Sequence, residues 1–110
     1  MNDKIFKSID IHKLSYFYKF TDEKEVSSFL FENTYLVDLL FELAKHLDIY
    51  FGSSRMYLSI NKTGIIQDQL MVRIYNKNDP DENDRLLGML DNGWWSRNIR
   101  RAQGKLVITA

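Results

Sequence analysis

Cysteine is missing from this chain of 110 residues. Its absence removes disulfides, thiolate metal ligands and cysteine nucleophiles together. It also fits a reducing compartment, so the sequence predicts a cytoplasmic location. One proline and five glycines are too few for a linker-rich or disordered chain. The sequence therefore predicts a single domain over residues 1–110, in which residues 1–20 form either a strand or an arm.

An excess of charge of either sign is missing too. The 15 Lys and Arg residues balance the 15 Asp and Glu residues, so the whole chain has no field that would hold a nucleic acid or an anionic membrane. A local basic patch is still compatible with this balance. Charged residues such as Asp38, Glu42 and Lys45 interrupt the most apolar stretch, which excludes a membrane span there. The N-terminus lacks the apolar core of a signal peptide.

Metal-ligating residues are few, because the chain has only two histidines. One of them, His46, follows Glu42 by four residues, which places both side chains on one face of a helix. A structural metal site needs about four ligands and a catalytic one about three. No third candidate ligand occurs at a spacing typical of metal sites, so we expect no metal. We interpret His46 as a residue at the border of the apolar helix face, hydrogen-bonded to Glu42 or to water.

Catalytic motifs are equally scarce. The serine pairs at 27–28 and 53–54 have no glycine-framed elbow and no partner signature. The acidic run 79–84 lacks the ligand pattern of a calcium loop, and acids in a first helical turn complement the helix dipole. We expect no catalytic residue and no cofactor. An enzyme remains an alternative that would need a pocket with converging polar groups and shifted pKa values.

A long helix over Thr34–Phe51 is the element around which the chain is organised. Its apolar residues recur at steps of four and three, which places them on one helical face. Other apolar residues widen this arc to about half the circumference, more than a surface helix needs. We therefore expect it to contact both a sheet and a second element along its flank. The main stripe consists of Leu36, Leu40, Leu43, Leu47 and Tyr50.

Further elements follow from alternation and from helix caps. Asp22 is predicted to cap a short helix ending near Phe31, and Asp79 a helix beginning at Pro80. The second of these helices is weakened by Gly88 and Gly93. A connection over residues 61–68 has Asn61 and Gly64 as turn residues. Alternating side chains predict strands within Ile5–Phe20 and at Arg55–Ile60, Gln69–Tyr75 and Lys105–Ala110.

Together these elements predict an α+β fold, a two-layer sandwich with a small, mostly antiparallel sheet of three to four strands and helices on one face. The order is strand, helix, strand, strand, helix, strand. Arg55–Ile60 and Gln69–Tyr75 form a hairpin, and a helical crossover makes the last strand parallel to Gln69–Tyr75. We place Arg55–Ile60 in the middle of these three strands and the N-terminal strand on an edge.

The outward face of this sheet is a candidate interaction surface. The solvent-exposed face of an antiparallel sheet usually has more charged residues than the outward face of this sheet does. We therefore expect the N-terminal segment or a second copy of the chain to cover it, with Tyr57, Met71 and Tyr75 as contact residues. The alternative is that Tyr and Thr simply favour strands. The outward residues are Tyr57, Ser59, Met71, Arg73, Tyr75, Lys105, Val107 and Thr109.

A second candidate surface lies in the segment Trp94–Arg101. Two adjacent tryptophans on a regular helix cannot both face the same way, so we expect Trp95 to pack inward with Ile99 and Trp94 to point elsewhere. Aromatic residues and arginines form protein-binding hot spots and platforms for single-stranded nucleic acid. The alternative is that Trp94 covers the rim of the core and the arginines neutralise a helix C-terminus. The candidate residues are Trp94, Arg97, Arg100 and Arg101.

Three segments carry a resemblance: FLFEN (29–33), NDPDE (78–82) and DNGWWSRNIRRAQGKLVIT (91–109). They resemble a group of small, uncharacterised bacterial α+β proteins common in cyanobacteria, over most of the chain after Val26. That group has an E-N before its long helix, a D-P-x-E helix start, and W-W followed by A-x-G-K-L. Gly88 and Gly93 depart from the pattern, and the chain stops at Ala110 where relatives run on. The resemblance implies a fold and no functional residue.

The leading hypothesis is a small cytoplasmic protein-interaction or regulatory domain without catalytic activity, with a protein partner or a second copy in a homodimer. It rests on the wide apolar arc of the long helix and on the half-apolar outer face of the sheet. The alternative is binding of RNA or single-stranded DNA through Trp94–Arg101, which would depend on salt.

Overall fold

The computed structural model describes the backbone of residues 3–62 and 66–110, and the side chains from Ser8 onward. The predicted turn residue Gly64 lies outside the described residues. In chain order the elements are α1 (Asp3–Leu14), β1 (Lys19–Phe20), α2 (Glu23–Glu32), α3 (Tyr35–Phe51), β2 (Arg55–Asn61), β3 (Gln69–Tyr75), α4 (Pro80–Leu90), a π-helical turn η1 (Asp91–Trp95), α5 (Ser96–Asn98), a 3₁₀ turn η2 (Ile99–Ala102) and β4 (Leu106–Thr109).

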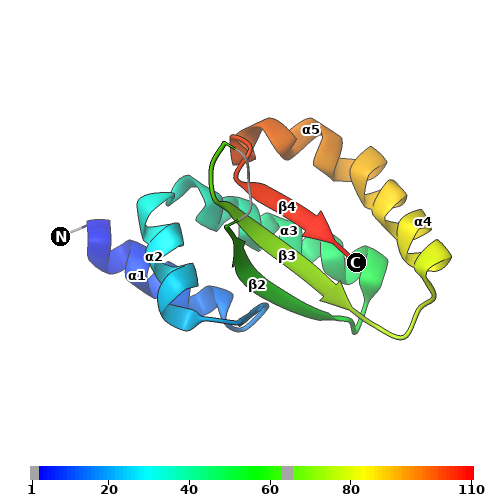
Figure 1. The fold of residues 1–110 in the computed structure, drawn as a ribbon, viewed down its shortest axis with the longest axis horizontal. Helices are drawn as coiled ribbons and strands as arrows, with labels where there is room; N and C mark the ends of the chain where they lie inside the picture. The colour runs from blue at the N-terminus through cyan, green and yellow to red at the C-terminus, as the bar shows by residue number, and fades with distance from the viewer. Residues whose placement is uncertain (1–2, 63–65) are drawn as a thin grey trace.

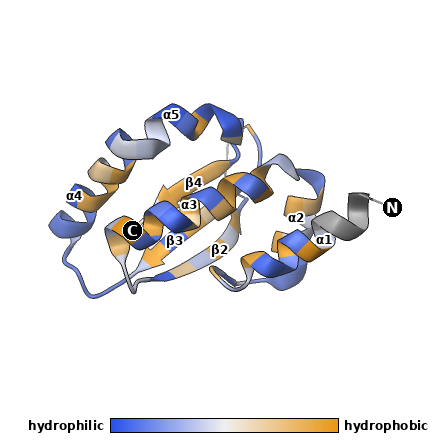
Figure 2. Cartoon of the chain, turned by 180° about the vertical axis from the view of Figure 1, so that it is seen from behind, coloured by the Kyte–Doolittle hydropathy of each residue, from blue (hydrophilic) through white to orange (hydrophobic). Residues whose placement is uncertain are grey.

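The long helix α3 lies where the sequence predicts it. Figure 1 shows it behind the strands, and Figure 2, seen from behind, shows it in front of them with apolar and polar segments alternating along it. The leucines of its main stripe are fully buried. Its flanks contact α1, α4 and η2. The expectation that α3 contacts more than the sheet is therefore confirmed.

The sheet has the order β1-β2-β3-β4. Strands β2 and β3 form the predicted antiparallel hairpin, while β1 is parallel to β2 and β4 is parallel to β3. The α+β class and the parallel final strand are confirmed, but the sheet is mixed rather than mostly antiparallel. The predicted middle position of Arg55–Ile60 is wrong. The crossover skips no strand and places β4 directly beside β3, and β1 takes the other edge of β2.

The N-terminal segment is mainly helical, so the strand predicted within Ile5–Phe20 is wrong except at Lys19–Phe20. Between Ser8 and Phe20, where the side chains of this segment are described, Ile11, Leu14 and Tyr18 are buried. Their steps of three and four follow the period of a helix rather than the alternation of a strand. Helix α1 packs against α2 and α3, and β1 adds two residues to the edge of β2.

The helix caps predicted at Asp22 and Asp79 are present. The Asp22 carboxylate accepts from the backbone N–H of Glu25 at 3.1 Å, and Asp79 accepts from the N–H of Glu82 at 2.8 Å. These bonds satisfy N–H groups that a helix start leaves without a partner. Asn33 and Thr34 separate α2 from α3, so the two are distinct helices, and Thr34 makes no side-chain capping bond to α3.

Helix α4 does not end at its glycines but continues as η1, α5 and η2. A Cβ atom added at Gly93 would overlap the hydroxyl oxygen of Tyr50, whereas one added at Gly88 would meet nothing within 4 Å. The helical run stops at Gln103 and Gly104, whose φ angles are 52° and 74°. Within the described residues, no helix is both long and apolar enough to cross a membrane.

Candidate interaction surface

The two faces of the sheet differ sharply in exposure. The inner face packs against the helices and buries Leu58, Leu70, Val72, Ile74 and Leu106. The opposite face, called here the outer sheet face, has no buried residue. The strand registers place on it Lys19, Arg55, Tyr57, Ser59, Asn61, Gln69, Met71, Arg73, Tyr75, Val107 and Thr109.

No described segment covers the outer sheet face. The N-terminal segment packs against α2 and α3 instead, so the expectation that it covers the sheet is wrong. Lys105 precedes β4, and its ammonium donates to the side-chain oxygen of Asn33 at 2.7 Å. The predicted outward position of Lys105 is therefore wrong too, because the side chain ties the start of β4 to the junction between α2 and α3.

Two tyrosines on this face form an aromatic pair. The rings of Tyr57 and Tyr75 meet edge to face, with centroids 5.0 Å apart and planes at 86°. The guanidinium carbon of Arg73, which is paired with Tyr57 across the hairpin, lies 5.9 Å from the Tyr75 ring centroid. These three residues, together with Thr21 and Ser59, line a shallow hollow of about 390 Å³.

Met71 lies on the same face but outside the tyrosine hollow. Its register partners are Ser59 on β2 and Val107 on β4. It lines a separate hollow of about 410 Å³ with Arg73, Tyr75 and Thr109 among its neighbours. All three sheet residues predicted from the sequence therefore share one face, and Tyr75 is half exposed, at 50%.

Charge is segregated on this face in a way that sequence reasoning missed. The four strands contain no aspartate or glutamate, although the chain as a whole is neutral. Their three cations, Lys19, Arg55 and Arg73, all belong to the outer sheet face. Within the described part of the chain, none of the three forms an ion pair. The strand sequences already contain cations and no acids. That the cations share one face becomes clear only when the strand register assigns each residue to a face.

The second predicted surface, Trp94–Arg101, is mostly internal. Trp94 and Trp95 are only 7% and 9% exposed. They lie in the π-helical turn η1 and both belong to the core, with ring centroids 5.9 Å apart. The expectation that Trp94 points elsewhere while Trp95 packs inward is therefore wrong. Trp94 stacks on His46 of α3, with ring centroids 4.5 Å apart. Ile99, predicted to pack inward, is 47% exposed.

Two of the three arginines in this segment bond within the molecule. Arg101 forms a two-pronged ion pair with Glu42 of α3, one bond measuring 3.1 Å, and Arg97 donates to the carbonyl of Gly93. Arg100 is exposed. The hydrogen bond from Arg101 holds the pKa of the Glu42 carboxyl below its usual value. Because a base-stacking platform needs an exposed ring face, we do not propose nucleic-acid binding through this segment.

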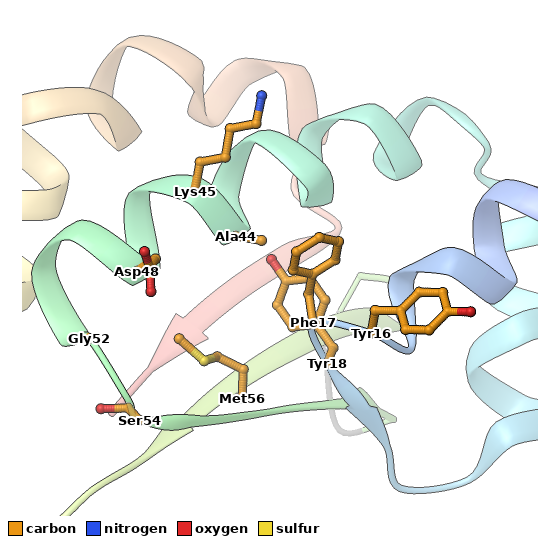
Figure 3. Close-up of a pocket in the computed structure, with 9 residues that line it drawn as sticks. All are labelled: Tyr16, Phe17, Tyr18, Ala44, Lys45, Asp48, Gly52, Ser54 and Met56. Atoms are coloured by element: carbon orange, nitrogen blue, oxygen red, sulfur yellow. The ribbon is translucent and has the colours of Figure 1, made fainter.

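A third surface feature lies beside α3, at the edge of the sheet. Figure 3 shows Met56 of β2 facing the helix near Asp48 and Ala44, with Phe17 and Tyr18 closing the hollow, whose volume is about 430 Å³. Phe17 is 54% exposed. Tyr18 is buried, and its hydroxyl donates to the Leu40 carbonyl at 2.7 Å. Nothing in this hollow indicates what would fill it.

No metal centre is formed within the described residues, where no three histidine, cysteine or acidic side chains come together. Comparisons of the chain with protein-family models, with curated proteins and with solved structures found no match. The resemblance to small bacterial proteins therefore stays an expectation, and any function has to be argued from the surfaces described above.

Proposed function

We propose that this chain is a small protein-interaction domain and that the outer sheet face is its binding surface. The observation that carries the proposal is the uncovered edge-to-face pair of Tyr57 and Tyr75, with Met71 on the same face. Tyrosine, methionine and arginine are enriched in the centres of protein interfaces. The lack of cysteine fits a cytoplasmic location, which we include in the proposal.

The size of the face bears on the kind of partner. Strands β2 and β3 have 7 residues each, β4 has 4 and β1 has 2. At about 3.3 Å per residue along a strand and about 4.8 Å between strands, the face has a footprint of roughly 300 Å². A stable interface buries about 800 Å² on each partner. The face alone therefore favours a transient complex with another protein, and a homodimer would have to recruit neighbouring surfaces.

Substitutions on the two layers of the molecule test the proposal. A double variant, Met71→Glu with Tyr75→Glu, places one charge in the middle of β3 and one at its end, both on the outer sheet face. The matched control is Ile49→Glu on α3, where the native side chain is 70% exposed. Tagged chains are recovered from native cells, and the proteins that co-purify are quantified after each variant is shown to unfold like the wild type.

We expect defined partners to disappear with the outer-face variant and to stay with the Ile49→Glu control. Partners that remain bound to the outer-face variant would contradict the proposal. Size-exclusion chromatography with light scattering adds a second readout. A dimer that dissociates in the double variant would identify a second copy as the partner. A persistent excess of nucleic-acid absorbance would count against a protein partner.

A further inference from the structure

We infer that the partner of the outer sheet face is an acidic protein segment, with a carboxylate beside Arg73 and an apolar or aromatic side chain against the tyrosine pair. This inference rests on the proposed function and names the chemistry of its partner. Its first support is charge complementarity. The face presents Lys19, Arg55 and Arg73 with no acid on any of the four strands. A carboxylate-bearing partner would be attracted there, and a basic one repelled.

The register arranges these cations around the aromatic pair. Lys19, Tyr57 and Arg73 are neighbours in one row across β1, β2 and β3. Arg55 stands in the next row, opposite Tyr75. Since neighbouring strands are about 4.8 Å apart, the backbones of Lys19 and Arg73 are about 10 Å from each other, with Tyr57 between them. A segment lying over the tyrosines would therefore meet cations on more than one side.

Arg73 is the best placed of the three cations to bind a carboxylate. Its guanidinium lies 5.9 Å from the Tyr75 ring centroid, a contact that helps to hold the side chain over the face. A guanidinium fork matches the geometry of a carboxylate and can bind it with two parallel hydrogen bonds. The adjacent hollow includes the Ser59 hydroxyl as a further polar group.

The same composition of tyrosine and arginine also occurs in single-strand nucleic-acid platforms, but the geometry here favours a protein. The rings of Tyr57 and Tyr75 are nearly perpendicular, at 86°, so they cannot both lie flat on the sheet to stack successive bases. The rest of the face includes Met71, Val107 and Thr109, which are neutral and suit the apolar centre of a protein interface.

Titration of the ¹⁵N-labelled full chain, followed by NMR, tests the inference with three probes. The first is a synthetic peptide in which glutamate alternates with phenylalanine and serine. The second has lysine in place of every glutamate, and the third is a single-stranded oligothymidylate. We expect only the acidic peptide to shift the amide signals of Tyr57, Arg73 and Tyr75, and added salt to weaken its binding.

Two arginine variants make the comparison specific. Arg73→Gln is expected to weaken binding of the acidic peptide about fivefold to tenfold, as loss of a charge-assisted hydrogen bond would. Arg85→Gln removes another exposed cation, one already paired with Glu82 on α4, and is expected to leave the affinity unchanged. If both variants weaken binding of the acidic peptide equally, the loss reflects the net charge of the chain, and the assignment of the carboxylate contact to Arg73 is overturned.

The inference is overturned if the acidic peptide shifts no amide signal on the outer sheet face. It is also overturned if the lysine peptide binds as tightly as the acidic peptide, or if the oligonucleotide binds more tightly than the acidic peptide. Its failure is separable from failure of the proposed function. If co-purifying partners still depend on Met71 and Tyr75 while the acidic peptide does not bind, only the partner's chemistry is wrong. If those partners are indifferent to both residues, the proposed function falls as well.

Discussion

The indole of Trp94 lies parallel to the imidazole of His46, with ring centroids 4.5 Å apart and planes at 19°. This stack joins the π-helical turn η1 to the long helix α3. It also accounts for the burial of Trp94, because His46 covers one face of the indole. The tryptophans therefore belong to the core rather than to a binding surface.

This burial predicts the fluorescence of the chain. Because Trp94 and Trp95 are both buried, we expect blue-shifted emission and weak quenching by iodide in the native state. Unfolding in urea should shift the emission to the red and restore quenching. Strong iodide quenching of the native chain, with no loss of structure, would contradict the packing of η1 against α3.

Gly93 and Gly88 should respond differently to the same substitution. Gly88→Ala is expected to raise the free energy of unfolding by about 1 kcal/mol, because alanine favours a helix interior and nothing lies within 4 Å. Gly93→Ala is expected to fall short of this gain by about 1 kcal/mol or more, because the new methyl group overlaps the Tyr50 hydroxyl and this side chain has to move aside. Urea denaturation measures both values.

The Tyr50→Phe background identifies the cause of the Gly93 effect. Removing the hydroxyl removes the atom that the alanine methyl group would overlap, so the shortfall of Gly93→Ala relative to Gly88→Ala should largely disappear there. If Gly93→Ala is as stabilising as Gly88→Ala in the wild-type background, the close approach of Tyr50 is wrong.

The ion pair between Glu42 and Arg101 predicts a loss of stability in acid. The hydrogen bond from Arg101 lowers the Glu42 pKa below its ordinary value of 4.5. The folded state therefore prefers the ionised carboxylate, so the stabilisation is fully present above pH 4.5 and is lost as pH falls through the lowered pKa. Since the two side chains are 42% and 44% exposed, we expect only about 0.5–1 kcal/mol.

Urea unfolding of the wild type and of Glu42→Gln at pH 7 and pH 3 measures this contribution. The difference between the two proteins should shrink at pH 3, whereas Asp84→Asn, which removes an exposed acid from α4, should show no such convergence. A difference for Glu42→Gln that stays constant with pH would mean that the ion pair adds nothing measurable.

Tyr18 predicts a loss of stability in base. Burial raises the pKa of its phenol above the ordinary value of 10.0, so the folded state holds the proton more tightly than the unfolded state does. The associated stability is fully present below pH 10 and is lost as pH rises above it. Tyr18→Phe should cost about 1 kcal/mol at pH 7, through loss of the bond to the Leu40 carbonyl.

Unfolding measured between pH 9 and pH 11 separates these two effects. The wild type should lose stability more steeply than Tyr18→Phe, and the two curves should converge or cross. Tyr16→Phe is the control, because Tyr16 is 78% exposed and should follow the wild type. Parallel curves for the wild type and Tyr18→Phe would contradict the burial of this phenol.

The elements with strong local signals could be predicted from the sequence. Helix α3 follows from its apolar period and strand β3 from its alternation, and the caps at Asp22 and Asp79 follow from short motifs. Helix α1 was missed because Leu14 and Tyr18 fit an alternating pattern and a helical one alike. Burial of Ile11 together with these two residues distinguishes the patterns, and burial depends on packing that a local pattern does not contain.

The errors in the sheet and in the candidate site have non-local causes. The position of β4 beside β3 depends on how the helical crossover packs, which no short segment specifies. Trp94 is buried against His46 of α3, and Gly93 lies close to the Tyr50 hydroxyl, so the packing of η1 involves residues far away in sequence. Tyr57 and Tyr75 were assigned to the correct face because alternation within a strand fixes the side on which a residue lies.

Photo-cross-linking in native cells tests the central claim most directly. A photoreactive amino acid replaces Met71 on the outer sheet face, Ile49 on α3, or Phe17 at the mouth of the hollow beside α3. We predict a defined protein adduct from position 71 and none from positions 49 or 17. An adduct from position 17 or 49 with none from position 71 would contradict the assignment of the outer sheet face as the interaction surface.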